Sequence, residues 1–145
     1  MNIANCTFHH IGYTVDDIEA SAKEFEQWGY TVAETVHDEA LTVDLCYLRK
    51  AGAPDVELVH QHNPASLEIH LFRQNGVCPY HLGFETVDID AATAELETMG
   101  YKRLFDPVPV AALGGTRICY YHHPKIGYIE LLELSRQCEK QTYMQ

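Results

Sequence analysis

The stretch that decides the fold is "HHIGYTVDDI", residues 9–18, because a closely similar stretch, "YHLGFETVDI", follows at residues 80–89. An offset of 71 residues places His81 on His10. Over residues 10–30 this alignment needs no gap, and nine of the 21 positions are identical to their partners. A duplication of this size predicts two copies of one structural unit in the chain.

Each copy predicts a strand followed by a helix. Apolar and polar residues alternate at about residues 6–15 and again at about 79–87, a pattern typical of a half-buried strand. Aspartate favours the start of a helix, and glycine favours the position just past its end. The expected capping residues are Asp16 or Asp17 with Gly29 in the first copy, and Asp88 with Gly100 in the second.

Three further strands are expected in each half, which gives each half the order βαβββ. These strands are expected at 31–36, 41–49 and 55–60, and at 102–106, 116–122 and 127–134. The predicted fold class is α+β, with two tandem βαβββ modules forming a cup-shaped mixed sheet with helices outside. We expect a single domain over residues 1–145, made of module one at about 6–60, a connector with one short helix at 61–78, module two at about 79–134, and a C-terminal tail at 135–145.

The composition excludes several classes of protein. A net charge of -11 would repel a phosphate backbone and an anionic membrane surface. No apolar run approaches the roughly 18 residues that a membrane span needs, and the first residues lack the pattern of a signal peptide. The five cysteines are scattered without C-x-x-C spacing, which argues against a disulfide framework or a zinc knuckle. We therefore expect a cytoplasmic protein that binds neither nucleic acid nor membrane.

The first strand of each copy carries a histidine on its polar face. Alternation places Ile11 and Tyr13 on one face of the first strand, and His10 and Gly12 on the other. The second copy repeats this arrangement with His81. Because the helix of each copy must cover the apolar face, we expect both histidines to point to the open side of the sheet.

The last strand of each half carries a glutamate inside an apolar run. These residues are Glu57 in "VELVH" and Glu130 in "GYIELLEL", and their separation of 73 residues makes them repeat partners after a two-residue insertion. A buried glutamate costs several kcal/mol unless a charge or a metal compensates it. Two such glutamates at matched positions therefore call for one explanation.

The explanation that the pattern favours is a shared divalent metal held by His10, Glu57, His81 and Glu130. Two imidazoles and two carboxylates are a mixed N/O ligand set that suits Ni, Co, Zn or Mn. With six-coordination, two positions would remain for water or substrate. Open positions indicate catalysis rather than a purely structural metal.

The remaining polar residues that attract attention have simpler interpretations. We expect a structural or solvent-exposed role for six other histidines, which are His9, His60, His62, His70, His122 and His123. Arg117 is the cation expected nearest to an anionic substrate.

The motifs "HHIGYTV", "VELVH", "PYHLGFETVDI" and "GYIELLEL" together resemble the vicinal oxygen chelate superfamily, which contains glyoxalases, bleomycin resistance proteins and dioxygenases. The resemblance extends over about residues 7–134, and within the family it is greatest to small bacterial glyoxalase I-like and methylmalonyl-CoA epimerase-like proteins. It implies the same four ligands, namely His10, Glu57, His81 and Glu130. It also implies a small-molecule substrate and a homodimer.

The family offers three functions for this chain. The first is a glyoxalase I-type lyase or isomerase that acts on a small thiol-derived substrate, in which Glu130 is the base and Glu57 its counterpart. The second is a methylmalonyl-CoA epimerase-like racemase, in which Asp38 takes the position of the epimerase's glutamate. The third is a metal-free binding or resistance protein, which four intact ligand positions disfavour.

Both enzymatic alternatives need a carboxylate that removes a proton from a carbon and a cation that stabilises the resulting negative charge. The position of Asp38 leaves the choice of base open. The simpler interpretation of Asp38 and its neighbour Glu39 is that both are solvated in a turn.

Overall fold

The computed structural model describes residue 3 and residues 5–134, so the expected C-terminal tail lies outside the described residues. The chain forms two compact units. The first unit comprises His9–Leu82, and the second comprises the described residues up to Phe8 together with 83–134. Two strands, β1 (Cys6–Thr14) and β5 (Cys78–Thr86), begin in one unit and end in the other.

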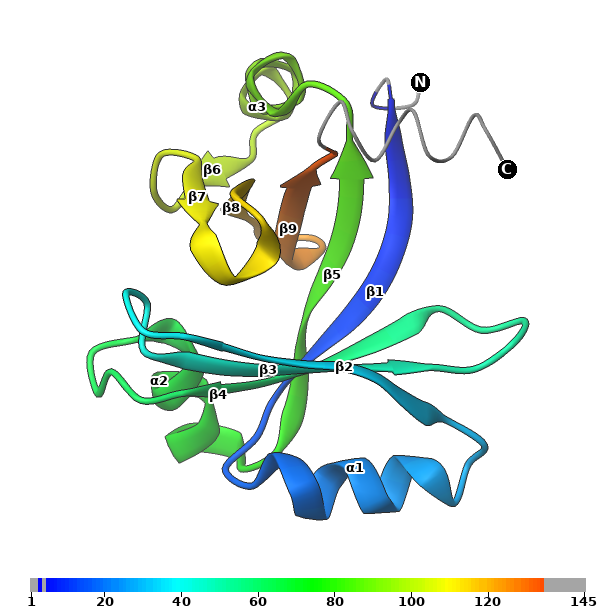
Figure 1. Cartoon of the computed structure of the whole chain (residues 1–145). Helices are drawn as coiled ribbons and strands as arrows, with labels where there is room; N and C mark the ends of the chain where they lie inside the picture. Colours follow the sequence, from blue (N-terminus) through cyan, green and yellow to red (C-terminus); the bar gives the residue numbers. More distant parts are fainter. Residues whose placement is uncertain (1–2, 4, 135–145) are drawn as a thin grey trace. The chain divides into compact units, whose positions relative to one another are not determined.

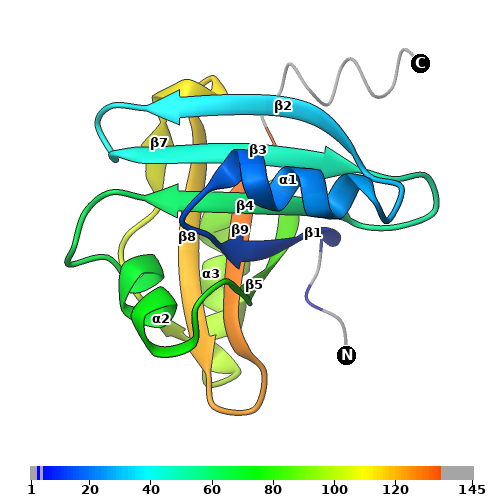
Figure 2. The same cartoon turned by 90° about the horizontal axis from the view of Figure 1, so that it is seen from below.

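The first unit is built on a mixed sheet in which the strand order is β2-β3-β4-β1 (Figure 2). The antiparallel part consists of β2 (Thr31–Asp38), β3 (Val43–Arg49) and β4 (Asp55–Gln61). Strand β1 pairs with β4 in parallel, so that Gly12 lies beside Glu57. Parallel pairing requires a connection that crosses the sheet, and α1 provides it before the chain enters β2, β3 and then β4.

Helix α1 (Ile18–Glu26) covers one face of this sheet and forms the core of the first unit (Figure 2). Alternation directs every second residue of β3 and β4 toward the helix. The buried residues of this core are Val15, Ala22, Cys46, Leu48, Val56 and Leu58. The expected apolar face of β1 is confirmed, because Tyr13 and Val15 both belong to this core.

The helix caps are those expected from the repeat. Asp17 accepts a hydrogen bond from the Ala20 N–H at 3.0 Å, and Asp88 accepts one from the Ala91 N–H at 3.0 Å. Gly29 and Gly100 have φ values of 92° and 91°. Only glycine adopts this region of φ readily, so both copies end their helix in the same way.

The second unit contains α3 (Ile89–Thr98), β6 (Lys102–Arg103), β7 (Val108–Val110), a short 3-10 helix at Ala111–Leu113, β8 (Thr116–His123) and β9 (Gly127–Glu133) (Figure 1). Strand β8 pairs antiparallel with β9, β6 and β7.

The predicted strand at 102–106 is wrong in its extent, because two short strands, β6 and β7, stand in place of one. Pro107 and Pro109 lack a backbone N–H, which limits the hydrogen bonds that this segment can make with β8, although Pro109 itself lies within β7 opposite Arg117.

The α+β class and the repeated order of a strand, a helix and further strands are confirmed. The connector carries the expected short helix, α2 (Leu67–Asn75), which begins at the capping residue Ser66. Within the described residues, no helix has the length and apolar character needed to cross a membrane. The assignment of the whole chain to a single domain stays a prediction.

Candidate metal centre

Three of the predicted ligands, His10, Glu57 and His81, lie together in the first unit. They come from three different strands, β1, β4 and β5, and their exposed fractions are 0%, 2% and 3%. The two histidine Nε2 atoms are 2.9 Å apart. Glu57 Oε1 lies 3.7 Å from His10 Nε2 and 3.4 Å from His81 Nε2.

These spacings fit a divalent metal ion. Two ligand atoms that lie about 2.1 Å from one ion, at angles of about 90° to 110°, are about 3.0–3.4 Å from each other. The distances among the nitrogen and oxygen atoms of His10, Glu57 and His81 are close to this range. Two buried imidazoles that direct the same ring nitrogen toward one carboxylate oxygen therefore form a suitable set of ligands.

Gly12 provides the space that His81 occupies. A Cβ atom at Gly12 would lie 2.0 Å from His81 Cε1, which is far below any normal contact distance. The imidazole of His81 therefore lies directly against the backbone of β1, beside the strand position that faces Glu57. The glycine of the "HHIG" motif is therefore required by packing, because any side chain at Gly12 would displace His81.

His10 is oriented by its sequence neighbour. The Nδ1 atoms of His9 and His10 are 2.7 Å apart, and His9 Nε2 lies 3.8 Å from the carboxylate of Asp55. With its Nδ1 engaged by His9, His10 directs Nε2 toward His81 and Glu57. Metal-binding histidines usually use their second nitrogen in such a contact. His9 therefore has a structural role, which is to orient the imidazole of His10.

The other side of the cluster rests on residues that the sequence pattern did not single out. The ring of Tyr80 packs edge-on against His81 with centroids 4.5 Å apart, and its hydroxyl donates to Glu68 Oε1 at 3.0 Å. Tyr47 lies opposite Glu57 in the β3–β4 ladder, and its ring centroid is 6.2 Å from that of His10. The register of β3 against β4 is the signal that would have found Tyr47.

Asp38 lies at the end of β2 on the sheet face that carries Glu57. It pairs with Val43, which in turn pairs with Gln61, and Gln61 is four residues after Glu57 on β4. Directly opposed residues point to the same side, and so do residues an even number apart on one strand. Asp38 Oδ1 accepts a hydrogen bond from the Leu41 N–H at 2.9 Å.

The interpretation of Asp38 as a solvated turn residue is wrong, because its exposed fraction is only 4%. The same interpretation is confirmed for Glu39, whose side chain is 93% exposed. The physical reason is that β2 continues to Asp38, so that this residue still takes part in the sheet while Glu39 begins the turn.

Glu130 is buried in the second unit, with an exposed fraction of 3%. It lies opposite Tyr120 in the β8–β9 ladder. Its neighbours Ile129 and Leu131 line an apolar hollow of about 300 Å³ within this unit, so the Glu130 side chain points to the other face of β9. A buried carboxylate in an apolar strand is confirmed here, and its part in the metal centre stays a prediction.

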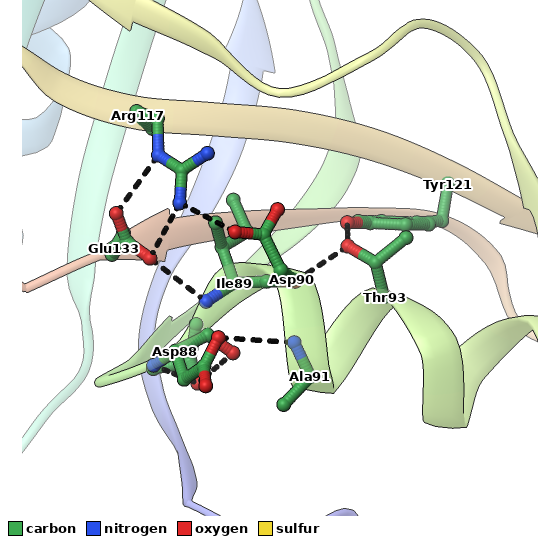
Figure 3. A network of polar contacts seen from close by, with 9 residues as sticks. Asp88, Ile89, Asp90, Ala91, Thr93, Arg117, Tyr121 and Glu133 are labelled. Carbon is green, nitrogen blue, oxygen red and sulfur yellow. Dashed lines mark hydrogen bonds and ion pairs between the residues drawn. The ribbon is translucent and has the colours of Figure 1, made fainter.

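Arg117 is expected from the sequence to be a substrate-binding cation, but it is surrounded by two carboxylates of the protein itself (Figure 3). Its guanidinium donates to both oxygens of Glu133 at 2.9 and 3.0 Å and to Asp90 at 2.9 Å. The hydrogen bonds to Glu133, and then those to Asp90, raise the pKa of Arg117. Because the Ile89 N–H also donates to Glu133, Arg117 joins β8 and β9 to the start of α3, and its charge is already compensated.

The sequence model of the Glyoxalase/Bleomycin resistance protein/Dioxygenase superfamily matches residues 9–120. The chain belongs to this superfamily. The match covers His10, Asp38, Glu57 and His81, and it ends before Glu130. A search of curated proteins found no matching relative.

Several solved structures are similar to this superfamily member over most of its length. Methylmalonyl-CoA epimerase from Mycobacterium tuberculosis is 19% identical, with a TM-score of 0.76 over 92% of this chain and 91% of that chain. A variant of Streptomyces coelicolor methylmalonyl-CoA epimerase in complex with 2-nitronate-propionyl-CoA is 27% identical, with a TM-score of 0.73 over 89% and 94%. A hypothetical protein from Bacillus halodurans is 20% identical, with a TM-score of 0.76 over 91% and 96%.

Proposed function

We propose that this chain is a metal-dependent enzyme of the epimerase type, which moves a proton at a carbon next to the carbonyl of a thioester. The metal ligands of the proposal are His10, Glu57, His81 and Glu130. When bound, a divalent ion such as Co, Ni, Zn or Mn supplies a positive charge that stabilises the enolate formed after proton removal. The substrate is a small molecule with an acidic carbon.

The ligand assignment is supported by burial and spacing in the first unit. His10, Glu57 and His81 direct their donor atoms to one point, and the outer contacts from His9 hold His10 in the required orientation. Glu130 is assigned from the internal repeat, as the partner of Glu57, and from its own burial in an apolar strand. Leaving these carboxylates without a cation would be costly.

The role of Asp38 distinguishes the two enzymatic alternatives, because only the epimerase type uses it as the base. Its burial and its position on the same sheet face as Glu57 are unexpected for a turn residue and suitable for a proton carrier. The hydrogen bond from the Leu41 N–H holds Asp38 Oδ1 in place and so orients the carboxylate. A general base must be oriented in this way before its basicity matters. Glu130 is the second carboxylate of the proposal: released from the metal and protonated, it would donate its own proton to the opposite face of the enolate carbon, while Asp38 keeps the proton that it removed.

The comparisons favour the epimerase alternative over the glyoxalase I type. Methylmalonyl-CoA epimerases recur among the similar structures, and one of them, at 25% identity and a TM-score of 0.76, contains methylmalonyl-CoA and NH4+. Methylmalonyl-CoA is therefore the first substrate to test. A glyoxalase I-type isomerisation of a hemithioacetal is the second, because it uses the same metal ligands with Glu130 as the base.

The test is deuterium exchange at the carbon next to the thioester, followed by NMR in D2O with the cobalt-loaded protein. We expect exchange with methylmalonyl-CoA, and a fall of at least about a hundredfold in Asp38→Asn, the usual scale for loss of a general base. Glu39→Gln is the matched control, because it alters a neighbouring but exposed carboxylate. It should exchange at the wild-type rate.

The opposite pattern would assign the glyoxalase I type. In that case the protein isomerises the hemithioacetal of methylglyoxal and glutathione, and Asp38→Asn has no effect on the rate. Stoichiometric binding of a ligand by a protein that retains no metal would instead identify a metal-free binding protein.

A further inference from the structure

A second group of metal-ligating side chains lies in the first unit, apart from the buried centre. Ligand atoms of Asp44, His60 and His62 all lie within 4.8 Å of one another. Asp44 and His60 occupy the positions of β3 and β4 that alternate with Leu45 and Val59. They therefore lie on the sheet face that α1 covers in part, opposite the face of Glu57.

Strand register brings these residues together. Asp44 pairs with His37 on β2 and with His60 on β4, so three adjacent strands each place one such residue in a single row. Directly opposed residues in antiparallel strands have Cβ atoms about 4.5–5.5 Å apart. His62 follows His60 by two residues and lies on the same side, with the two rings 4.3 Å apart.

Asp44 is the centre of the group. One of its carboxylate oxygens lies 2.7 Å from His62 Nε2, and the other lies 2.5 Å from His37 Nδ1. The hydrogen bond from His62, followed by that from His37, lowers the pKa of Asp44. Asp44 is therefore a carboxylate at neutral pH, held in a fixed direction between two imidazoles.

The backbone beneath the group is tied together at the end of the sheet. The His62 N–H donates to the Thr42 carbonyl at 2.9 Å, just beyond the last residue of β4. The Gln61 side chain accepts from Thr42 Oγ1 at 2.9 Å and donates to the Leu41 carbonyl at 3.1 Å. These contacts join the β2–β3 turn to the end of β4, so His62 is presented from a rigid position.

We propose that Asp44, His60 and His62 bind a second divalent transition-metal ion, Zn²⁺ by preference, with His37 orienting Asp44 through its second oxygen. Two imidazoles and one carboxylate select Zn, Ni or Cu over Mg and Ca, which prefer oxygen ligands. The His62 side chain is 44% exposed, so water completes the coordination and the ion exchanges with solvent. This role departs from the solvent-exposed role expected for His60 and His62.

The competing explanation is that these residues form ordinary surface ion pairs around Asp44. Such pairs contribute little to stability and need only one histidine for each carboxylate oxygen. His60 distinguishes the two explanations, because its ring lies against that of His62, with the two planes tilted by 48°, and contributes a donor atom to the group. His37 and His62 already engage the two oxygens of Asp44, so ion pairing gives no reason for a third imidazole at this position.

The test is the zinc stoichiometry of the full-length, metal-free protein, titrated with Zn²⁺ against a chromophoric chelator of micromolar affinity. The His60→Ala/His62→Ala double variant should bind one equivalent less than wild type. The His10→Ala/His81→Ala double variant should keep the equivalent that the first variant loses. His70→Ala, an exposed histidine on α2, is the matched control and should bind as wild type does.

The result is read as a difference between variants, so it does not depend on whether the buried centre takes zinc or on the proposed function. Equal stoichiometry and affinity in wild type and in His60→Ala/His62→Ala would overturn the proposal. If that double variant fails to fold, as judged by circular dichroism, Asp44→Asn replaces it because it keeps the side-chain shape. Unchanged zinc binding in a folded Asp44→Asn protein overturns the proposal equally.

Discussion

The two histidine clusters of the first unit use the same residue types on opposite faces of one sheet. His10, His81 and Glu57 have exposed fractions of 3% or less, whereas the His62 and Asp44 side chains are 44% and 33% exposed. Water can stabilise the charge of Asp44, but it cannot reach Glu57. We infer from the comparison that burial, rather than the choice of side chains, sets how much each cluster would gain from a bound cation.

The two clusters also differ in how their backbone is built. The buried cluster joins three strands that are distant in the sequence, and it requires Gly12 to admit the His81 ring. The exposed cluster depends on the local register of β2, β3 and β4. Disturbing the buried cluster should therefore affect both metal binding and folding, while disturbing the exposed cluster should affect metal binding with only a small, pH-dependent effect on stability.

The largest effect is expected for His81→Ala. It removes one of two buried imidazoles and leaves Glu57 in an apolar site with a weaker set of ligands, so metal affinity should fall by more than about a hundredfold, beyond the range for outer contacts. Elemental analysis after dialysis measures the loss. A His81→Ala protein that retains stoichiometric metal would show that the buried cluster is not the metal centre.

The next effect is expected for Gly12→Ala. The added methyl group overlaps the His81 ring, so the ring must move away from Glu57 while the α1 core is untouched. We expect about a 10–100-fold loss of metal affinity, comparable to the loss of a conserved outer contact. The measurement is cobalt titration followed by visible absorption. Wild-type affinity in Gly12→Ala would mean that the His81 ring is not a ligand in the observed position.

A smaller effect is expected for His9→Ala, which removes the contact that orients His10. Metal affinity should fall by about tenfold, at the lower end of the range for outer contacts. His9→Asn is the matched variant, because its side-chain oxygen can occupy the position of the imidazole Nδ1 and should restore part of the affinity. Equal losses in the two variants would indicate that His9 acts through packing alone.

The smallest effect concerns the pH dependence of stability in the metal-free protein. The hydrogen bond with Asp44 raises the pKa of His37, so this pair stabilises the fold below the unfolded histidine pKa of about 6.5 and is lost as pH rises through the folded value. The pKa of Asp44 is lowered, so its contribution is present above about 3.9, the unfolded value, and is lost as pH falls through the folded one.

The pair therefore contributes most at mildly acidic pH. Urea unfolding of wild type and His37→Ala in the presence of a chelator should give different midpoints at pH 5.5 and nearly equal midpoints at pH 9. A difference that persists at pH 9 would show that His37 stabilises the sheet by some means other than its charge.

Much of the site followed from periodicity and repetition. The offset of 71 residues brought His10 and His81 into one hypothesis, and the apolar runs around Glu57 and Glu130 marked both glutamates as buried. The extent of β6 and β7 could not be predicted as easily, because an alternating pattern does not show how far a segment that contains prolines pairs with its neighbour.

Asp38 and Arg117 show why local patterns fail for single polar residues. Asp38 lies just past the strand expected at 31–36 and just before a turn, and only its pairing with Val43 shows that it is still part of the sheet. Arg117 looked like an accessible cation, but its charge is compensated by Glu133 and Asp90, which lie 16 and 27 residues away in the sequence. Long-range ion pairs of this kind leave no periodic signal.

The amino-acid sequence determined the α+β class, the repeated unit, the helix caps and the candidate ligands, because alternation, capping and duplication are properties of neighbouring residues. Tertiary structure decided which sheet face holds Asp38, how His9 orients His10, and that Asp44, His60 and His62 form a group. The face of Asp38 and the grouping of Asp44, His60 and His62 depend on strand register, so a shift of one residue in register would move these side chains to the other face of the sheet. The orientation of His9 depends on its packing against Asp55 and Tyr47, which lie on neighbouring strands.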